Sequence, residues 1–450
     1  MSASLDRPAI TNFGARLAVW WKVATVYRDK RVLAITFLGI SSGFPLGILG
    51  DPLTAWLQES GLSKTSIGLF ALVGLPYAFK FLWAPAFDRF RIPFVTAALG
   101  RRRGWIIVSQ IALLICVLSL GFVDLPDDIF LAAIVTLGVA FTSASQDIVI
   151  DAYRVEILEE RQLGAGAATV VFGYRLGQVG AGAMGLIIAS SYGWTVAFAL
   201  MAAIAVIGIL TVLLNPEPKS ETSPRIEETM LAGLKTSVIS PLADFFSRPG
   251  WLLILGVIVF YKLGDAVLSM MQTPFFLELE FTKPEIAGIK KGVGFAAIIA
   301  GGFIGGAMVA GLGILKSLFI CGILQALSNL VFVYQALAGH DLTALTITVA
   351  AENIATGMGS TAFVAYLSSL CNQAYTATQY ALLTSVMGGA RTFLSASAGW
   401  FADQMDWVSF FVLTTVAALP GLFLIWLLMR RYPAHGQKLR VTEHAPNAGH

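Results

Sequence analysis

The sequence predicts an all-α membrane protein whose twelve transmembrane helices form two six-helix halves. Of its 450 residues, 56% are hydrophobic and only 13% are charged, whereas soluble domains contain about 25% charged residues. Such a chain cannot cover itself with a polar surface. Apolar segments long enough to cross a bilayer also recur along the whole sequence, and the basic residues gather in alternate loops between them.

The apolar segments are separated by short polar loops and by one long polar interruption. The predicted spans are residues 32–57, 65–87, 105–123, 129–150, 165–190, 194–214, 251–277, 285–312, 315–337, 342–369, 378–400 and 408–429. Residues 152–163 are expected to form a separate short amphipathic helix. Gly173 and Gly177 give the fifth span a face of small residues, which favours close helix packing.

The distribution of lysine and arginine predicts the orientation of these spans. With six spans in each half, 22 of the 30 basic residues fall on one side, two on the other and six within spans. Because basic residues gather on the cytoplasmic side, both termini are expected there.

These observations divide the chain into five expected parts. They are a cytoplasmic tail with an interfacial helix (1–31), an N-terminal six-helix bundle (32–214), a cytoplasmic linker (215–249), a C-terminal six-helix bundle (250–429) and a cytoplasmic tail (430–450). The interfacial helix is expected at residues 12–30, and the linker is expected to contain an amphipathic helix near Ile226–Ser237.

The two halves also match each other in sequence. LSKTSIG (62–68) occupies the place that FTKPEIAG (281–288) has in the second half. Arg175 lies 32 residues after Ser143, and Arg391 lies 31 residues after Ser360. Two such halves, related by an axis along the membrane normal, indicate the major facilitator layout around a central cavity.

Charged side chains lie inside the predicted spans and need a polar environment. They are the cations Lys80, Arg175, Lys262, Lys291 and Arg391 and the anions Asp147, Asp151, Asp265 and Glu352, with the amides Gln146 and Asn353 beside two of the anions. At about 3 kcal/mol each, nine unpaired charges would cost roughly 27 kcal/mol, more than the about 5–15 kcal/mol that stabilises a domain. We therefore expect them to be paired or to line a water-filled cavity.

Three of the carboxylates are candidates for carrying a proton. Since no histidine lies in a span, a proton-driven process would need Asp147, Asp265 or Glu352. Asp147 and Asp151 share one helix face, although Asp151 and Arg154 could instead mark where the helix leaves the membrane. Lys262 and Asp265 could likewise be only a local ion pair.

Several kinds of function are not supported. Cys116, Cys321 and Cys371 have no metal-ligand spacing, and the sequence has no Walker loop and no HExxH motif. GISSG (39–43) matches a nucleophile pattern, but no histidine within the spans could activate Ser41. A net charge of +3 does not indicate nucleic-acid binding. We expect no enzyme, no cofactor and no metal, and a chain without an N-terminal signal peptide.

A family resemblance rests on motifs spread over residues 32–429. They are YAFKFLWAPAFDRF, GRRRGW, SASQDIVIDAYR, GAGAA with GYRLG, YKLGDA, GMGSTAFVAYLSSLCN and ATQYALL. Together they resemble the AmpG-type muropeptide permeases. The resemblance implies a proton-driven importer of anhydromuropeptides in the bacterial inner membrane. It also implies a part in peptidoglycan recycling and in the signalling that induces β-lactamase.

The same resemblance implies a gate and leaves other substrates open. Asp88, Arg89 and the run Arg101, Arg102 and Arg103 look like the facilitator loop motif, in which Asp88 would help to close the cytoplasmic side. The arginine run fits simple cytoplasmic anchoring equally well. Acetyl-coenzyme A transporters belong to the same broad family, and a non-transporting sensor is a further alternative. The expected partners are an anionic small-molecule substrate, protons and the lipid bilayer, and the expected state is a monomer.

Overall fold

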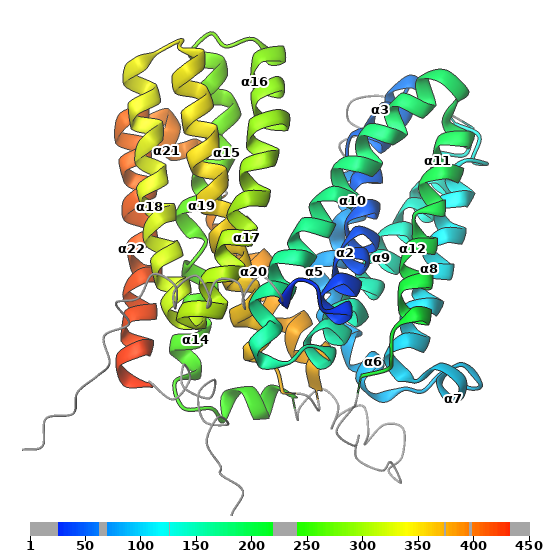
Figure 1. Cartoon of the computed structure of the whole chain (residues 1–450). Helices are drawn as coiled ribbons and strands as arrows, with labels where there is room; N and C mark the ends of the chain where they lie inside the picture. Colours follow the sequence, from blue (N-terminus) through cyan, green and yellow to red (C-terminus); the bar gives the residue numbers. More distant parts are fainter. Residues whose placement is uncertain are drawn as a thin grey trace, which may run out of the picture.

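The computed structural model describes residues 26–62, 70–125, 127–218, 241–372, 375–395 and 398–432. These residues form helices and loops arranged as two bundles that stand side by side (Figure 1). Most of the predicted interfacial helix at 12–30 and the predicted linker helix at 226–237 lie outside the described residues.

The first bundle comprises the helices before the linker. They are α2 (Lys30–Ile48), α3 (Asp51–Glu59), η1 (Phe70–Gly74), α5 (Leu75–Phe79), η2 (Lys80–Leu82), α6 (Ala84–Arg89), α7 (Val95–Leu99), α8 (Arg101–Leu120), α9 (Ile129–Ile157), η3 (Glu160–Gln162), α10 (Leu163–Tyr192), α11 (Trp194–Ala203) and α12 (Ala205–Leu214). The predicted second span is thus built from short pieces. Pro76 and Pro85 stand in the first turns of α5 and α6, where a missing N–H is tolerated.

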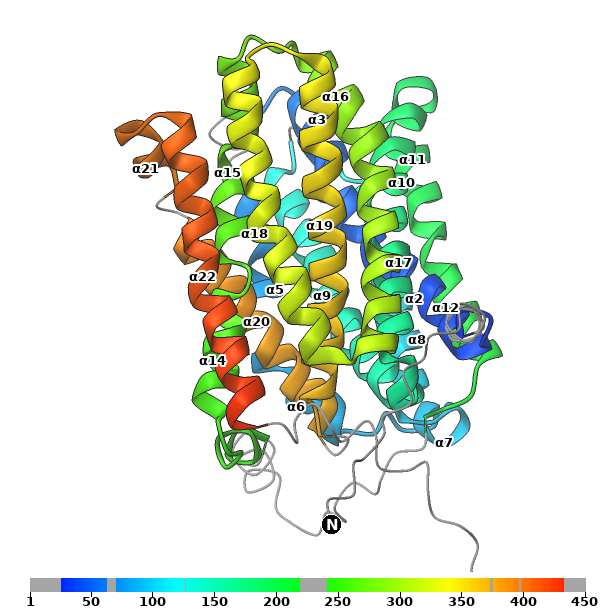
Figure 2. The same cartoon turned by 60° about the vertical axis from the view of Figure 1, so that its left-hand side comes forward.

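The second bundle comprises the helices after the linker. They are α14 (Trp251–Phe260), α15 (Leu263–Glu278), α16 (Lys283–Ile289), the π-helical turn η4 (Lys290–Gly294), α17 (Phe295–Leu312), α18 (Ile314–Ala338), α19 (Leu342–Ser369), α20 (Thr376–Ser395), α21 (Ala398–Gln404) and α22 (Trp407–Arg431). Figure 2 shows α18 and α19 running through most of the height of this bundle, with α16 above α17 beside them.

The membrane prediction agrees with the helices found. Among the described residues, nine helical stretches are long and apolar enough to cross a membrane. α19 is equally long, but Glu352, Asn353 and its threonines make it more polar. Large apolar side chains such as Leu33, Phe37 and Phe423 remain exposed, as expected of surfaces that contact lipid.

One predicted boundary is wrong. Residues 152–163 do not form a separate helix, because α9 continues without interruption from Ile129 to Ile157. Asp151, Arg154 and Glu156 continue the helix because they find partners inside the protein. Charges that looked like a helix terminus in the sequence are therefore part of the packed interior.

Glycine allows the closest helix contacts, as the sequence predicted for Gly173 and Gly177. A methyl group added at Gly173 would lie 2.1 Å from the carbonyl oxygen of Thr36, and one at Gly177 would lie 2.3 Å from that of Ile40. The second bundle repeats this between α17 and α19, where Gly301 approaches the carbonyl oxygen of Ile354 at 2.1 Å by the same measure. The close packing is confirmed.

Replacing Gly43 by alanine is expected to destabilise the protein. The added methyl group would lie 2.0 Å from the Tyr174 carbonyl oxygen, and overpacking of this kind costs about 1–3 kcal/mol. Thermal unfolding in detergent should therefore show a lower Tm. Gly180→Ala is the matched control, because nothing lies within 4 Å of its added methyl group. Equal Tm values for the two variants would contradict the packing argument.

The bundles contact each other near one end of the molecule. We call it the linker end, because residues 215–218 lie there. Here Gly164 at the start of α10 packs against Gly306 and Val309 of α17, and α20 packs against α5, η2, α6 and α9. Toward the other end, the far end, which carries α3 and α16, the ribbons of the two bundles diverge (Figure 1).

Candidate functional site: polar clusters inside and between the bundles

The second bundle holds a connected group of polar side chains at mid-height. It consists of Lys262, Asp265, Gln325, Glu352, Asn353, Thr356 and Ser360, called the second-bundle cluster here. Lys262 lies in the break between α14 and α15, and Asp265 follows in the first turn of α15. Gln325 comes from α18, and the other four come from α19.

Asp265 lies at the centre of this cluster. Its Oδ2 lies 3.1 Å from Nζ of Lys262 and accepts a hydrogen bond from Nε2 of Gln325 at 2.7 Å. Lys262 also donates to Oγ of Ser360 at 3.2 Å. Because Lys262 and Asp265 bond to α18 and α19 as well as to each other, their pair is more than a local contact within one helix. Their side chains are 16% and 17% exposed, so water can reach the pair.

Glu352 and Asn353 extend the cluster along α19. Oε2 of Glu352 accepts from Nδ2 of Asn353 at 2.8 Å, and Oε1 lies 3.2 Å from Oγ1 of Thr356. Lys290 and Lys262 act on Glu352 electrostatically. The structure thus brings together two of the three predicted proton-carrying carboxylates with a predicted cavity cation and amide.

The third carboxylate, Asp147, lies in the first bundle. Its Oδ1 accepts from Oγ of Ser42 on α2 at 2.6 Å, and Lys80 is near enough to act on it electrostatically. The neighbouring Gln146 donates from Nε2 to the Ser41 carbonyl oxygen at 2.7 Å. Lys80, Gln146 and Asp147 are all buried.

Several buried polar atoms around Asp147 have no partner among the described protein atoms. They are the hydroxyls of Ser41, Tyr77 and Ser143, Oε1 of Gln146 and both amide atoms of Gln110. Buried polar groups of this kind are normally satisfied by water. The interior of the first bundle therefore has sites for ordered water.

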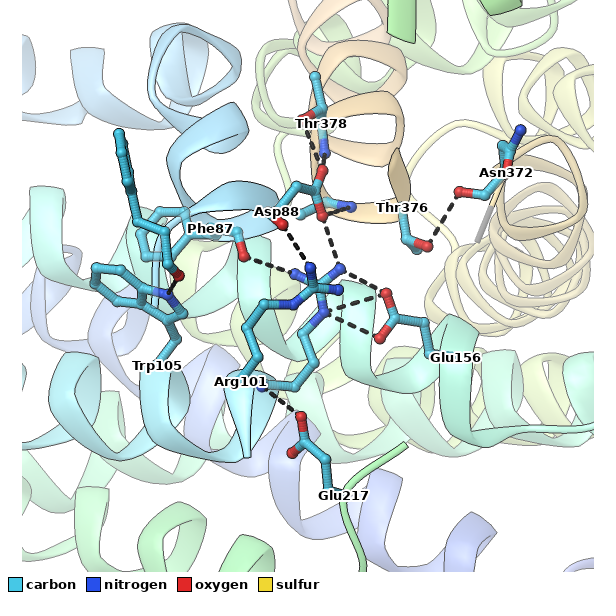
Figure 3. Close-up of polar contacts among 12 residues, drawn as sticks. Phe87, Asp88, Arg101, Trp105, Glu156, Glu217, Asn372, Thr376 and Thr378 are labelled. Carbon is cyan, nitrogen blue, oxygen red and sulfur yellow. Dashed lines mark hydrogen bonds and ion pairs between the residues drawn. The ribbon is translucent and has the colours of Figure 1, made fainter. Parts of the chain in front are cut away.

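Three of the predicted gate residues, Asp88, Arg101 and Arg102, meet at the linker end, where Figure 3 shows Asp88 beside Arg101. Oδ2 of Asp88 accepts from the backbone N–H of Thr378 at 2.8 Å and from its hydroxyl at 2.7 Å, and Oδ1 accepts from Nη2 of Arg102 at 2.7 Å. Asp88 thus places its charge at the N-terminus of α20, where the helix dipole favours an anion. It connects the two bundles.

Glu156 and Glu217 complete this arrangement, which we call the linker-end latch (Asp88, Arg102, Glu156, Glu217 and Thr378). Oε2 of Glu156 lies 3.0 Å from Nε of Arg102, whose side chain is 1% exposed. Glu217 accepts from the backbone N–H groups of Arg102 and Arg103 at 2.7 and 3.0 Å, so it caps α8. Arg101 donates to the Asp88 carbonyl oxygen.

Arg154 is a second connection between the bundles. It is fully buried and lies on α9, where its Nη2 is 3.3 Å from Oδ1 of Asp151. Across the interface, its Nη1 donates to Oγ of Ser368 at 2.8 Å, and its guanidinium lies 5.1 Å from the ring centroid of Tyr380. Arg154 therefore connects the bundles, while its ion pair with Asp151 lies within α9.

Asp244, just before α14, holds the loop between α19 and α20. It pairs with Arg248 and accepts from Asn372 at 3.1 Å and from Gln379 at 2.7 Å. Partial burial by itself raises the pKa of Asp244. The hydrogen bonds from Gln379, Arg248 and Asn372 lower this pKa by more, so the pKa lies below its usual value. The folded state therefore favours the ionised form.

This depressed pKa predicts how stability depends on pH. The contribution of Asp244 is complete above its unfolded pKa of about 3.9, and it is lost as the pH falls through the lower folded pKa. We expect wild type to be more stable than Asp244→Asn at pH 6–7, with the difference shrinking in acid. Tm values of the two proteins across pH, measured in detergent, check this. A constant difference would contradict it.

Three predicted cavity residues stand apart from these groups. Arg175 donates to Gln178 on its own helix at 3.3 Å, and Lys291 and Arg391 are exposed. The predicted gate residue Arg103 donates to the Leu213 carbonyl oxygen at 3.3 Å, while Arg89, at the end of α6, is half-buried. The cavity role of the first three residues and the gate role of the last two therefore stay predictions.

Sequence reasoning missed several polar residues of these groups. None of them stands out in the sequence as a charge inside an apolar span. They are Ser42, Gln325, Thr356, Glu156 and Thr378. Thr378 lies in the motif ATQYALL and Glu156 lies two residues after Arg154, but neither position reveals its partner. Only the fold shows that Asp88 and Thr378 meet.

Two hollows beside η1, α5 and α9 are apolar. Their volumes are about 470 and 650 Å³, and both are lined by Leu75, Ile134 and Leu137. Neither wall contains a charged side chain, so charge cannot hold an anionic solute there. The polar clusters are the better candidates for handling solute and protons.

Comparison with known proteins gives consistent matches. The profile of the Major Facilitator Superfamily matches residues 32–311. The "Anhydromuropeptide permease" of Escherichia coli (strain K12) is 38% identical over 402 residues, covering 89% of this chain and 80% of the relative. "Putative transporter AmpG 4" of Rickettsia felis is 35% identical, covering 91% of this chain and 99% of the relative.

Solved structures support the fold. The proton:xylose symporter XylE has a TM-score of 0.62 at 14% identity and covers 91% of this chain and 96% of that chain. The human organic anion transporter MFSD10 has a TM-score of 0.56 at 15% identity and covers 90% of this chain and 99% of that chain.

Proposed function

The chain belongs to the major facilitator superfamily and is a multi-pass membrane transporter, not an enzyme; from this we propose that it imports anhydromuropeptides by proton symport. The proposed substrate rests on the 38% identity to an anhydromuropeptide permease, which extends over 89% of the chain. By the same proposal it serves peptidoglycan recycling and the induction of β-lactamase.

The proposed orientation places the linker end in the cytoplasm of a bacterium, with the protein in the inner membrane. The 22 basic residues on the linker side, against two on the other, support this. We propose a monomer with the five parts expected from the sequence. They are a cytoplasmic tail (1–31), two six-helix bundles (32–214 and 250–429), the cytoplasmic linker between them (215–249) and a second cytoplasmic tail (430–450). With the bundles joined at the linker end, this conformation would receive solute from the periplasm.

The residue roles follow from the polar clusters. Asp147, Asp265 and Glu352 couple protons, and Lys80, Gln146, Asp151, Arg175, Lys262, Lys291, Asn353 and Arg391 bind solute or line the cavity. Asp88, Arg89, Arg101, Arg102 and Arg103 form the cytoplasmic gate. The closed contact of Asp88 with Thr378 and Arg102 supports the gate. Ion pairs and amides at mid-helix support a polar path.

Counterflow in proteoliposomes tests the transport. Vesicles loaded with unlabelled N-acetylglucosaminyl-anhydro-N-acetylmuramyl peptide should take up the labelled compound from outside. Vesicles loaded with acetyl-coenzyme A are the control and should not. Exchange with acetyl-coenzyme A alone would show that the proposed substrate is wrong. No exchange with either compound would contradict the proposal that the protein transports them.

The proton gradient is tested in the same vesicles. With an imposed gradient, labelled substrate should accumulate above its outside concentration, and a protonophore should abolish this accumulation. Accumulation that is indifferent to the protonophore would remove the proton coupling while leaving transport in place.

A further inference from the structure

In the second-bundle cluster, one hydroxyl lies between two carboxyl groups. Oγ1 of Thr356 is 3.2 Å from Oε1 of Glu352 and 3.3 Å from Oδ2 of Asp265. A threonine hydroxyl has one hydrogen to donate and two lone pairs to accept with. It therefore cannot donate to both carboxyl groups. If both were ionised, one contact would place two oxygen atoms together without a hydrogen between them.

The surroundings of the two carboxyl groups differ. Asp265 pairs with the Lys262 ammonium at 3.1 Å and accepts a hydrogen bond from the Gln325 amide at 2.7 Å. Glu352 has no ion pair within the described part of the chain. Its Oε2 accepts from Asn353 at 2.8 Å, as the carbonyl oxygen of a neutral carboxyl group can. Its Oε1 lies 3.2 Å from Oγ1 of Thr356, and it is the donor in this contact only when it carries a proton.

We infer that Glu352 holds the transported proton in this conformation, that the Thr356 hydroxyl connects it to Asp265, and that Lys262 keeps Asp265 ionised. The inference rests on the proposed proton symport and names the residue that performs it. The hydrogen bonds then run in one direction, from Glu352 to Thr356 and from Thr356 to Asp265, with each hydrogen used once.

Charges of both signs act on Glu352. Those acting on it come from Asp265 and Lys262 on the α14–α15 segment and from Lys290 on η4. α17 packs against α19 through Gly301 and Gly305 and contributes no charge at these contacts. The Asp265 carboxylate disfavours a second anion beside it. Glu352 is half-buried, so it can exchange a proton with water.

The proton step needs no further reactant. On release, the O–H bond of the Glu352 carboxyl group breaks and the proton passes to water on the cytoplasmic side. Glu352 becomes a carboxylate, and the nearby Lys262 and Lys290 offset its charge. The Thr356 hydroxyl then turns and donates to Glu352 in place of Asp265.

Infrared difference spectroscopy on the purified protein tests the assignment without any transport. Wild type should show the carbonyl stretch of a protonated carboxyl group at neutral pH, and Glu352→Gln should lose this band. Glu278→Gln is the matched control, since Glu278 is exposed and accepts a hydrogen bond from Trp407 at the far end; it should keep the band. A band that persists in Glu352→Gln but disappears in Asp147→Asn would move the proton to the first bundle and overturn the inference.

Transport gives a second readout. Glu352→Gln should lose accumulation driven by a proton gradient, whereas the control Glu278→Gln should keep it. Thr356→Val should weaken gradient-driven accumulation, and Thr356→Ser, which keeps the hydroxyl, should restore it. Full accumulation by Glu352→Gln would overturn the inference.

The two levels of failure are distinguishable. If wild type shows counterflow without any response to the gradient, the proposed symport fails. If wild type is coupled and Glu352→Gln remains coupled, symport stands and only the assignment to Glu352 fails.

Discussion

Replacing Arg102 by glutamine is expected to destabilise the protein by about 3–5 kcal/mol, the usual effect of breaking a buried ion pair. Arg102 is 1% exposed and contacts the carboxylates of both Asp88 and Glu156. Without its charge, two buried carboxylates would remain close together and both would lose their ion pair with Arg102. The latch would then lose both its internal ion pairs and the fixed position of Asp88 against α20. Thermal unfolding in detergent measures the effect as a lower Tm.

Arg31→Gln is the control for this prediction. Arg31 also pairs with a glutamate, Glu159, but the two side chains are 43% and 49% exposed. Exposed pairs contribute about 0–1 kcal/mol, so this variant should remain close to wild type. Arg102→Lys keeps the charge but cannot reproduce the two-sided contact, and it should fall between them. Equal stabilities of Arg102→Gln and Arg31→Gln would show that the latch does not stabilise the fold.

Replacing Arg154 by methionine is expected to open the linker end. The substitution keeps much of the side-chain volume but removes the hydrogen bond to Ser368 and the contact with the Tyr380 ring, both across the interface. Hydrogen bonds to charged groups contribute about 1.5–3 kcal/mol, so the ratio of open to closed molecules should rise roughly ten- to a hundredfold.

Cys371 can report this opening through its rate of labelling with a maleimide, in a background with Cys116→Ser and Cys321→Ala. It follows α19 at the linker end, where burial raises the pKa of its thiol and the Arg154 guanidinium partly lowers it. Removing Arg154 without opening the linker end would therefore make the reactive thiolate scarcer and slow the labelling. Labelling should be faster in Arg154→Met and unchanged in Arg161→Met, whose arginine is 76% exposed. Equal rates in the two variants would mean that Arg154 does not hold the bundles together.

Much of the fold could be predicted because the bilayer imposes a simple pattern on the sequence. Long apolar segments mark the spans, and the contrast in basic residues between alternate loops gives the expected sidedness. Close packing of α10 could be predicted from Gly173 and Gly177, since spacing alone places both on one helix face, but the structure was needed to identify α2 as the partner. These features are local, so one sequence is enough to reveal them.

The partners of the charged residues could not be predicted, because they depend on contacts between distant segments. Asp88 meets Thr378 across 290 positions of the chain, and no local pattern specifies that pairing. The charges Asp151 and Arg154 looked like a helix end at the membrane surface, but Ser368 and Tyr380 receive Arg154 in the interior. Arg391 has the place in the second half that Arg175 has in the first, and its side chain is exposed.

The π-helical turn at Lys290–Gly294 has a consequence for the charge beside Glu352. Such a turn accommodates one residue more than an α-helical turn. Rewinding it to α-helical geometry would rotate the preceding segment about the helix axis by about 100°, the angle per residue of an α-helix. Lys290 would swing away from Glu352, while α17 kept its glycine contacts with α19. A screw motion of one short segment could thus alter the local field without separating the packed helices.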